Sequence, residues 1–339
     1  MPFIKEILKY NSLSIVGLEK NTGKTECLNY ILNRLPHDKT VAVTSIGIDG
    51  ERVDLVTKTP KPEIFIRDGV YFSTSQVHYK EKRILAEIVN ITNESGALGR
   101  IITARALSSG KVLLSGPSSI FSLNRWMQEM NEFNVDLKIV DGALSRLSLA
   151  SPVVCESMVL ATGAALSVSM DILISKTKFI TKLIDIEQLD GDICSQLLDI
   201  ESGVWGIDES DGAVVDLKIP SSLLLNKIDK DFTKNCKYIY VSGALTERFL
   251  RMISDSANVK GLVLIIRDFT KIFVDELSFN SFIRRGGEFK VLGKSKLIAV
   301  CVNPFSPNGY VLNSNVLCEK LSQAIQMPVY DIVKNKYDF

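Results

Sequence analysis

Apolar and polar residues alternate along the first half of the chain in short blocks, which predict strands and helices in turn. Apolar runs predict strands at 13–16, 40–44, 111–114, 137–140 and 158–160. Apolar residues at helical spacing predict helices at 26–35, 82–91, 120–133 and 171–183. Strands that alternate with helices are typical of a parallel sheet with helices on both faces. We therefore expect an α/β domain in this half.

The second half repeats the alternation after a less regular stretch at about 190–220, which is richer in glycine and acidic residues. Strands are predicted at 238–241, 261–266, 297–302 and 329–332, with helices at 245–254, 273–282 and 315–325. A chain of 339 residues is long for a single domain. We predict one domain at 1–190, an irregular connection at 191–220 and a second, smaller α/β domain at 221–339.

Composition narrows the classes of function. Apolar residues make up 46% of the chain and the formal net charge is +1, without a basic block, so nucleic acid is not an expected partner. No apolar run reaches the length of a bilayer span, and no membrane partner is expected. The six cysteines are scattered, which favours reduced thiols and a cytoplasmic protein over a disulfide or zinc framework.

The segment 14–29 carries the most specific chemistry and reads SIVGLEKNTGKTECLN. Gly17, Gly23, Lys24 and Thr25 have the order of a phosphate-binding loop, although five residues separate the glycines where the strict pattern has four. Glycines let backbone N–H groups close around phosphate oxygens, lysine reaches the outer phosphates, and threonine takes one position on Mg²⁺. We predict a P-loop NTPase domain that binds ATP and Mg²⁺ through Gly17, Asn21, Thr22, Gly23, Lys24 and Thr25.

Two acidic positions complete the predicted site. Asp141 follows an apolar strand and precedes a glycine, which suits a carboxylate delivered to the carboxyl edge of a sheet. Asp49 lies in TSIGIDGERVD, a loop that could order when triphosphate is bound, with Asp54 as second choice. We predict Lys24, Asp49 and Asp141 as catalytic residues, and Thr25, Asp49 and Asp141 as metal ligands. Ordinary Asp-Gly turns are the alternative for both carboxylates.

Two small-residue loops follow predicted strands, at 115–119 and 161–165. Each could contact a ligand, and each could equally be a tight connection. Arg146 could place a cation near the phosphates or be an exposed structural arginine.

Four segments together resemble one bacterial family: GLEKNTGKT, TSIGIDGERVD, DGALSRLSLASP and LATGAALS. They are similar to the P-loop subunits of the reactivating factor for lysine-5,6-aminomutase, an enzyme that uses adenosylcobalamin and pyridoxal phosphate. The resemblance implies an ATPase that helps remove damaged cobalamin from the mutase. It also implies two partners, the aminomutase and a second reactivase subunit that resembles the MutS class of ATPases. The chain has no Asp-x-His-x-x-Gly corrinoid-ligand motif, so it is not expected to carry cobalamin itself.

Other nucleotide-dependent functions stay open. The spacing of the glycines also resembles dethiobiotin synthetase, and KNTGKT resembles a GTP-binding protein of molybdenum-cofactor assembly. The string NKID at 226–229 matches a guanine-reading motif literally, but it lies in an irregular stretch beyond the proposed domain boundary. A regulatory module that binds nucleotide without hydrolysis is the third alternative.

Overall fold

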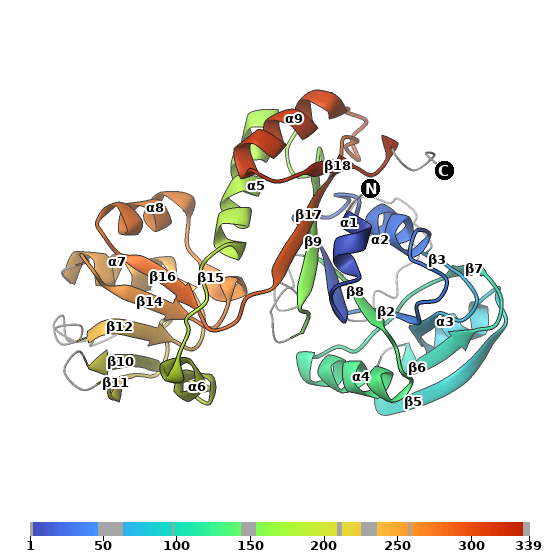
Figure 1. The fold of residues 1–339 in the computed structure, drawn as a ribbon, viewed down its shortest axis with the longest axis horizontal. Coiled ribbons are helices and arrows are strands. Elements are labelled where there is room, and N and C mark those ends of the chain that lie inside the picture. Colours follow the sequence, from blue (N-terminus) through green and yellow to red (C-terminus); the bar gives the residue numbers. More distant parts are fainter. Residues whose placement is uncertain are drawn as a thin grey trace. The chain divides into compact units, whose positions relative to one another are not determined.

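The computed structural model describes residues 3–46, 64–96, 98–143, 154–208, 212–224, 236–256 and 259–334. The chain divides into two compact units, drawn in Figure 1. Unit 1 consists of Met1–Lys178 and Ser295–Phe339, and unit 2 is Phe179–Lys294. Unit 2 is therefore an insertion into the chain of unit 1.

Unit 1 is built on a large, mostly parallel sheet. Among the described residues, nine strands form it in the order β18-β17-β9-β1-β8-β2-β4-β6-β5. The strands from β18 to β4 run parallel, and β6 is antiparallel to both β4 and β5. Their bounds are β1 Ser12–Gly17, β2 Val41–Ser45, β4 Tyr71–Ser75, β5 Ala86–Gly96, β6 Gly99–Ala106, β8 Leu137–Ala143, β9 Ser157–Gly163, β17 Lys296–Asn303 and β18 Val329–Asp331.

Helices cover both faces of this sheet. On one face, Leu28 and Ile31 of α2 (Lys24–Leu32) pack with Ile15 and Ile139 of the sheet and with α1 (Phe3–Ile7). On the other face, α4 (Ile120–Glu132) packs Leu123, Trp126 and Met130 against Ala42 and Val140. All six residues of β1 are buried, as expected for a parallel strand covered on both sides. The other elements of the unit are β3 Ile64–Ile66, α3 Gln76–Glu81, β7 Gly110–Val112, α9 Ser314–Ile325 and the start of α5 Met170–Ile184.

Unit 2 is a second α/β unit. Among the described residues its main sheet has five strands in the order β11-β10-β12-β14-β16, of which β12, β14 and β16 are parallel. In its core Phe279 of α8 stacks on Phe289, and Phe282 packs against the same ring at a tilt. Its elements are α6 Asp192–Leu198, β10 Val204–Asp208, β11 Val214–Ile219, β12 Cys236–Val241, β13 Leu245–Thr246, α7 Glu247–Ser256, β14 Val263–Ile266, the 3-10 turn Phe269–Lys271, β15 Ile272–Phe273, α8 Glu276–Arg284 and β16 Glu288–Val291.

The structure corrects the predicted domain bounds. The segment 295–339 belongs to unit 1 and not to the second domain, because β17 pairs with β9 and then with β18. Unit 2 also begins earlier than predicted, at Phe179, so the stretch 191–220 supplies α6, β10 and β11 of a folded unit. An insertion of this kind returns the chain to a distant strand, and local periodicity carries no signal for such a pairing.

Two predicted elements are also wrong in type or place. The predicted helix at 82–91 is mostly the strand β5, because the β-branched Ile88 and Ile91 pair with Ala104 and Ile102 of β6. The predicted strand at 111–114 is only partly formed, as β7. That strand pairs with β3 in a separate two-stranded sheet and not with the main sheet.

Candidate functional site

The loop between β1 and α2 has the backbone of a tight strand-to-helix connection. Gly23, the N-cap of α2, has φ of 91°, and Asn21 has φ of 62°. Both values lie in the left-handed region, which glycine adopts freely and asparagine tolerates better than most residues. Asn21 and Gly23, both predicted to bind the phosphates, are therefore the two left-handed positions of the loop.

The Lys24 side chain folds back over the end of β1. A Cβ added to Gly17 would lie 2.7 Å from Cγ and 2.8 Å from Cδ of Lys24, and 2.6 Å from Oγ1 of Thr22. Real Cβ atoms essentially never make contacts this short, so a side chain at position 17 would force Lys24 or Thr22 to move. The Lys24 stem thus lies against Gly17, as long side chains in helices point back toward the N-terminus.

Three hydrogen bonds hold the loop in shape, one within the loop and two to neighbouring strands. The Leu18 N–H donates to the Ala161 carbonyl of β9 at 2.9 Å. Within the loop, buried Thr22 donates from Oγ1 to the Glu19 carbonyl at 2.8 Å. Nδ2 of Asn303, at the end of β17, donates to the Asn21 carbonyl at 3.2 Å. The loop is thus fixed from both sides before any ligand binds.

The first turn of α2 is not capped by an N-cap side chain, because the N-cap is Gly23. The first N–H groups of a helix lack partners within the helix, and the helix dipole places positive charge there. Gly17 at the end of β1 and Lys24 at the start of α2 both lie next to this helix end.

Asp141 lies on the same face of the sheet as α2. It pairs with Ile15 of β1 and Ser45 of β2, and paired residues of parallel strands project to one face. Ile15 belongs to the core that α2 covers. The structure therefore brings the Asp141 carboxylate to the sheet edge and the face that also carry Thr25, in the first turn of α2. A carboxylate and a hydroxyl are oxygen ligands that suit Mg²⁺.

Ser45 is a polar residue at this edge that was not among the predicted site residues. Its hydroxyl is buried and has no hydrogen-bond partner among the described residues. It neighbours Asp141 across the sheet, and the pairing continues as the Ile46 N–H donates to the Asp141 carbonyl at 3.2 Å. Asp49, Asp54, Arg146 and the string at 226–229 lie outside the described residues.

The two small-residue loops are tight connections. Ser115 is fully buried, and its hydroxyl contacts Nδ1 of His78 at 3.0 Å. A Cβ on Gly116 would lie 1.6 Å from the Ser45 carbonyl oxygen, and one on Gly163 would lie 2.1 Å from the Asn303 carbonyl oxygen. Both loops pack against the strands that carry the candidate site.

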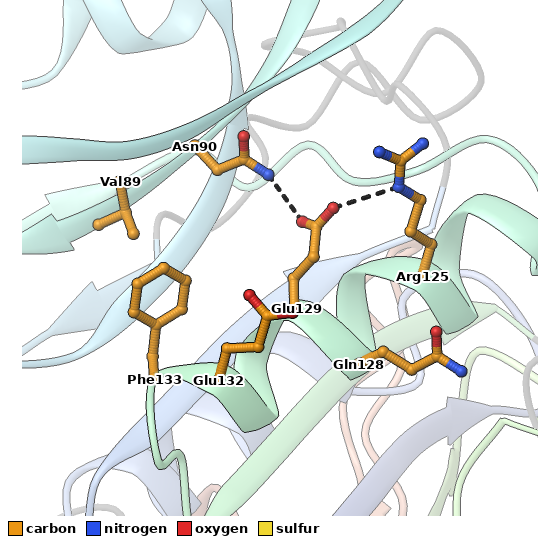
Figure 2. A pocket seen from close by; sticks show the side chains of 7 residues that line it. All are labelled: Val89, Asn90, Arg125, Gln128, Glu129, Glu132 and Phe133. Atoms are coloured by element: carbon orange, nitrogen blue, oxygen red, sulfur yellow. Dashed lines mark hydrogen bonds and ion pairs between the residues drawn. The ribbon is translucent and has the colours of Figure 1, made fainter.

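A cavity of about 450 Å³ lies elsewhere in unit 1, between the edge strand β5 and α4 (Figure 2). One of its two acidic residues, Glu129, accepts a hydrogen bond from Nδ2 of Asn90 at 2.8 Å and forms an ion pair with Nε of Arg125 at 3.3 Å, as the dashed lines show. The carboxylate is thus held by its neighbours. The cavity contains no residue of the loop, so we do not assign it to the same site. It is lined by Val89, Asn90, Arg125, Gln128, Glu129, Glu132 and Phe133.

The chain contains six cysteines. All six are free thiols, and Cys27 and Cys301 are fully buried with their Sγ atoms 3.7 Å apart. The hydrogen bond with Cys27, together with burial, raises the pKa of Cys301 well above its ordinary value, which keeps the thiol protonated and unreactive. Within the described ranges, no cluster of three His, Cys, Asp or Glu side chains could hold a metal ion.

Comparison of the chain with protein-family models, curated proteins and solved structures finds no match. Across the part of the chain that the structure describes, helices fall short of the length and apolar character needed to cross a bilayer.

Proposed function

We propose that the chain is an ATPase that binds MgATP at the loop Gly17–Thr25. The observation that carries this proposal is the close packing of the Lys24 stem against Gly17 at the first turn of α2. Glycine at position 17 leaves room for this stem, since a Cβ there would lie 2.7 Å from Lys24 Cγ. Asp141, on the same face of the sheet, is the second support.

Each residue has a separate task in this proposal. The backbone amides of the loop and the first turn of α2 bind the phosphates, and the Lys24 ammonium neutralises their outer charge. Thr25 and Asp141 hold Mg²⁺, which supplies charge stabilisation for the transferred phosphoryl group. Asp49 stays a predicted catalytic residue and metal ligand, because the described residues do not include it.

The biological role we propose is that of a reactivating factor for an adenosylcobalamin-dependent aminomutase. The support is the resemblance of four segments of the sequence to the reactivase of lysine-5,6-aminomutase. Only a difference in affinity between open and closed mutase can shift its conformation toward release of a damaged corrinoid. ATP binding and hydrolysis would cycle that affinity, and the second subunit and the mutase would be the partners.

Titration calorimetry with ATP and Mg²⁺ tests the nucleotide site. Lys24→Ala should weaken binding by roughly 10–150-fold, since hydrogen bonds to charged groups contribute about 1.5–3 kcal/mol. The matched control is Lys320→Ala, which removes an exposed lysine from α9. Equal affinity in wild type and Lys24→Ala would remove the proposal.

A second assay tests the biological role. Cobalamin exchange in an inactivated aminomutase should require the chain, the second subunit and ATP, and should be lost with Lys24→Ala. A phosphorylated or ligated small product would instead indicate a biosynthetic enzyme of the dethiobiotin-synthetase type. A preference for guanine nucleotides would indicate the cofactor-assembly GTPase.

A further inference from the structure

Asn303 is a residue of the candidate site that the sequence pattern did not reveal. It ends β17, where it pairs with Gly163 of β9, and β9 in turn pairs with β1. Figure 1 shows β17 and β9 side by side in unit 1. Asn303 is thus at the carboxyl edge of the sheet, on the side of β1 opposite to Asp141.

Both ends of the Asn303 side-chain amide are hydrogen-bonded. Nδ2 donates to the Asn21 carbonyl at 3.2 Å, and Oδ1 accepts from the Phe305 N–H at 3.1 Å. One partner is an acceptor and the other a donor, so only this orientation of the amide satisfies both. The stem of the same residue lies against Gly23, where an added Cβ would approach Asn303 Cβ to 3.0 Å. One side chain therefore contacts both left-handed positions of the loop.

The hydrogen bond to Asn21 sets the direction of a loop amide. In a trans peptide the carbonyl and the following N–H point in opposite directions. Because Asn303 holds the Asn21 carbonyl toward β17, the Thr22 N–H is turned away from β17. Without this hydrogen bond, the left-handed conformation of Asn21 would be less favoured, since most non-glycine residues avoid it.

We propose that Asn303 is a positioning residue for the triphosphate. Its amide and its stem hold the two left-handed positions, Asn21 and Gly23, so that the loop has its phosphate-binding shape before ATP arrives. This inference rests on the proposed nucleotide site. It adds a requirement that the loop sequence itself does not contain: a donor at the end of β17.

Asn303→Asp removes the donor and adds a negative charge, whereas Asn303→Ala removes the amide without adding charge. The carboxylate keeps the acceptor for the Phe305 N–H but cannot donate to the Asn21 carbonyl, so the turn after β17 is retained. We expect the affinity for MgATP at about pH 8 to fall at least about tenfold, and Asn303→Ala to lose about threefold to tenfold. The control is Asn308→Asp, the same charge change at an exposed position in the following loop, which should stay within about twofold of wild type.

The pH dependence separates positioning from general damage to the fold. A protonated carboxyl can donate again, so the affinity of Asn303→Asp relative to wild type should recover as the pH falls from about 8 to about 5. Urea unfolding without nucleotide shows whether each variant is folded. Folded Asn303 variants that bind MgATP like wild type would overturn this inference alone. If wild type binds no ATP, the proposed function fails with it.

Discussion

Replacing Gly17 by alanine adds a methyl group where the Lys24 stem lies. The added carbon would stand 2.6 Å from Thr22 Oγ1 and 2.7 Å from Lys24 Cγ. Thr22 has little freedom to retreat, since its side chain is buried and bound to the Glu19 carbonyl. We therefore expect the lysine stem to move, and the loop to lose its outer cation while the rest of unit 1 stays folded.

Two magnitudes follow from this geometry. The neighbours of the new methyl are about 0.6–0.8 Å inside ordinary contact distance, and overpacking of this kind costs about 1–3 kcal/mol of stability. A displaced Lys24 gives up hydrogen bonds to phosphate of about 1.5–3 kcal/mol, which is roughly a 10–150-fold loss of affinity. The perturbation should thus reduce both stability and binding, and the loss of binding should persist where the variant is fully folded.

The assay pairs calorimetric titration of MgATP with urea unfolding of the same sample. Gly243→Ala is the matched control, because a Cβ at Gly243 meets nothing within 4 Å and its φ is not in the left-handed range. We expect its stability to change by no more than about 0.5 kcal/mol and its affinity to be unchanged. A folded Gly17→Ala protein with the affinity of wild type would show that Lys24 does not contribute to phosphate binding through this loop.

Two further predictions concern two carboxylates, that of Asp141 in β8 and that of Asp136 just before β8. Asp141→Asn should reduce Mg²⁺-dependent nucleotide affinity or hydrolysis by about 10–100-fold while leaving binding measured with EDTA unchanged, and equal losses in both conditions would exclude a metal role. For Asp136, hydrogen bonding from the Thr40 N–H at 2.9 Å lowers the carboxyl pKa below its ordinary value, helped by Lys39. A lowered folded-state pKa stabilises the fold above the unfolded pKa, and that stability is lost as pH falls through the folded value. The difference in unfolding free energy between wild type and Asp136→Asn should therefore shrink between about pH 5 and about pH 3, and a pH-independent difference would contradict this cause.

The strand, loop and helix around the candidate site were readable from sequence because their signals are local. Gly17, Gly23 and Lys24 lie within one strand, one loop and one helix, and the structure forms all three elements there. The strand before Asp141 was equally readable as an apolar run. That Asp141 shares a face with α2 was not, because this depends on the pairing of β8 with β1 across the chain.

The long-range part of the site could not be predicted in this way. Asn303 was assigned to the second domain, since nothing local to 297–302 indicates a return to the first sheet. The pairing of β17 with β9 depends on an insertion, Phe179–Lys294, that folds as its own unit. Helical spacing at 82–91 failed for a related reason: β-branched residues there gain from pairing with β6, and this tertiary gain overrides the local pattern.

A crystal structure of the chain with a non-hydrolysable ATP analogue and Mg²⁺ tests the central claim most directly. We expect the triphosphate against the backbone amides of residues 23–25, with the Lys24 ammonium on its outer phosphates and the Thr25 hydroxyl on the metal. A nucleotide bound elsewhere in the chain, or a loop that stays without phosphate at a saturating concentration of the analogue, would contradict the claim.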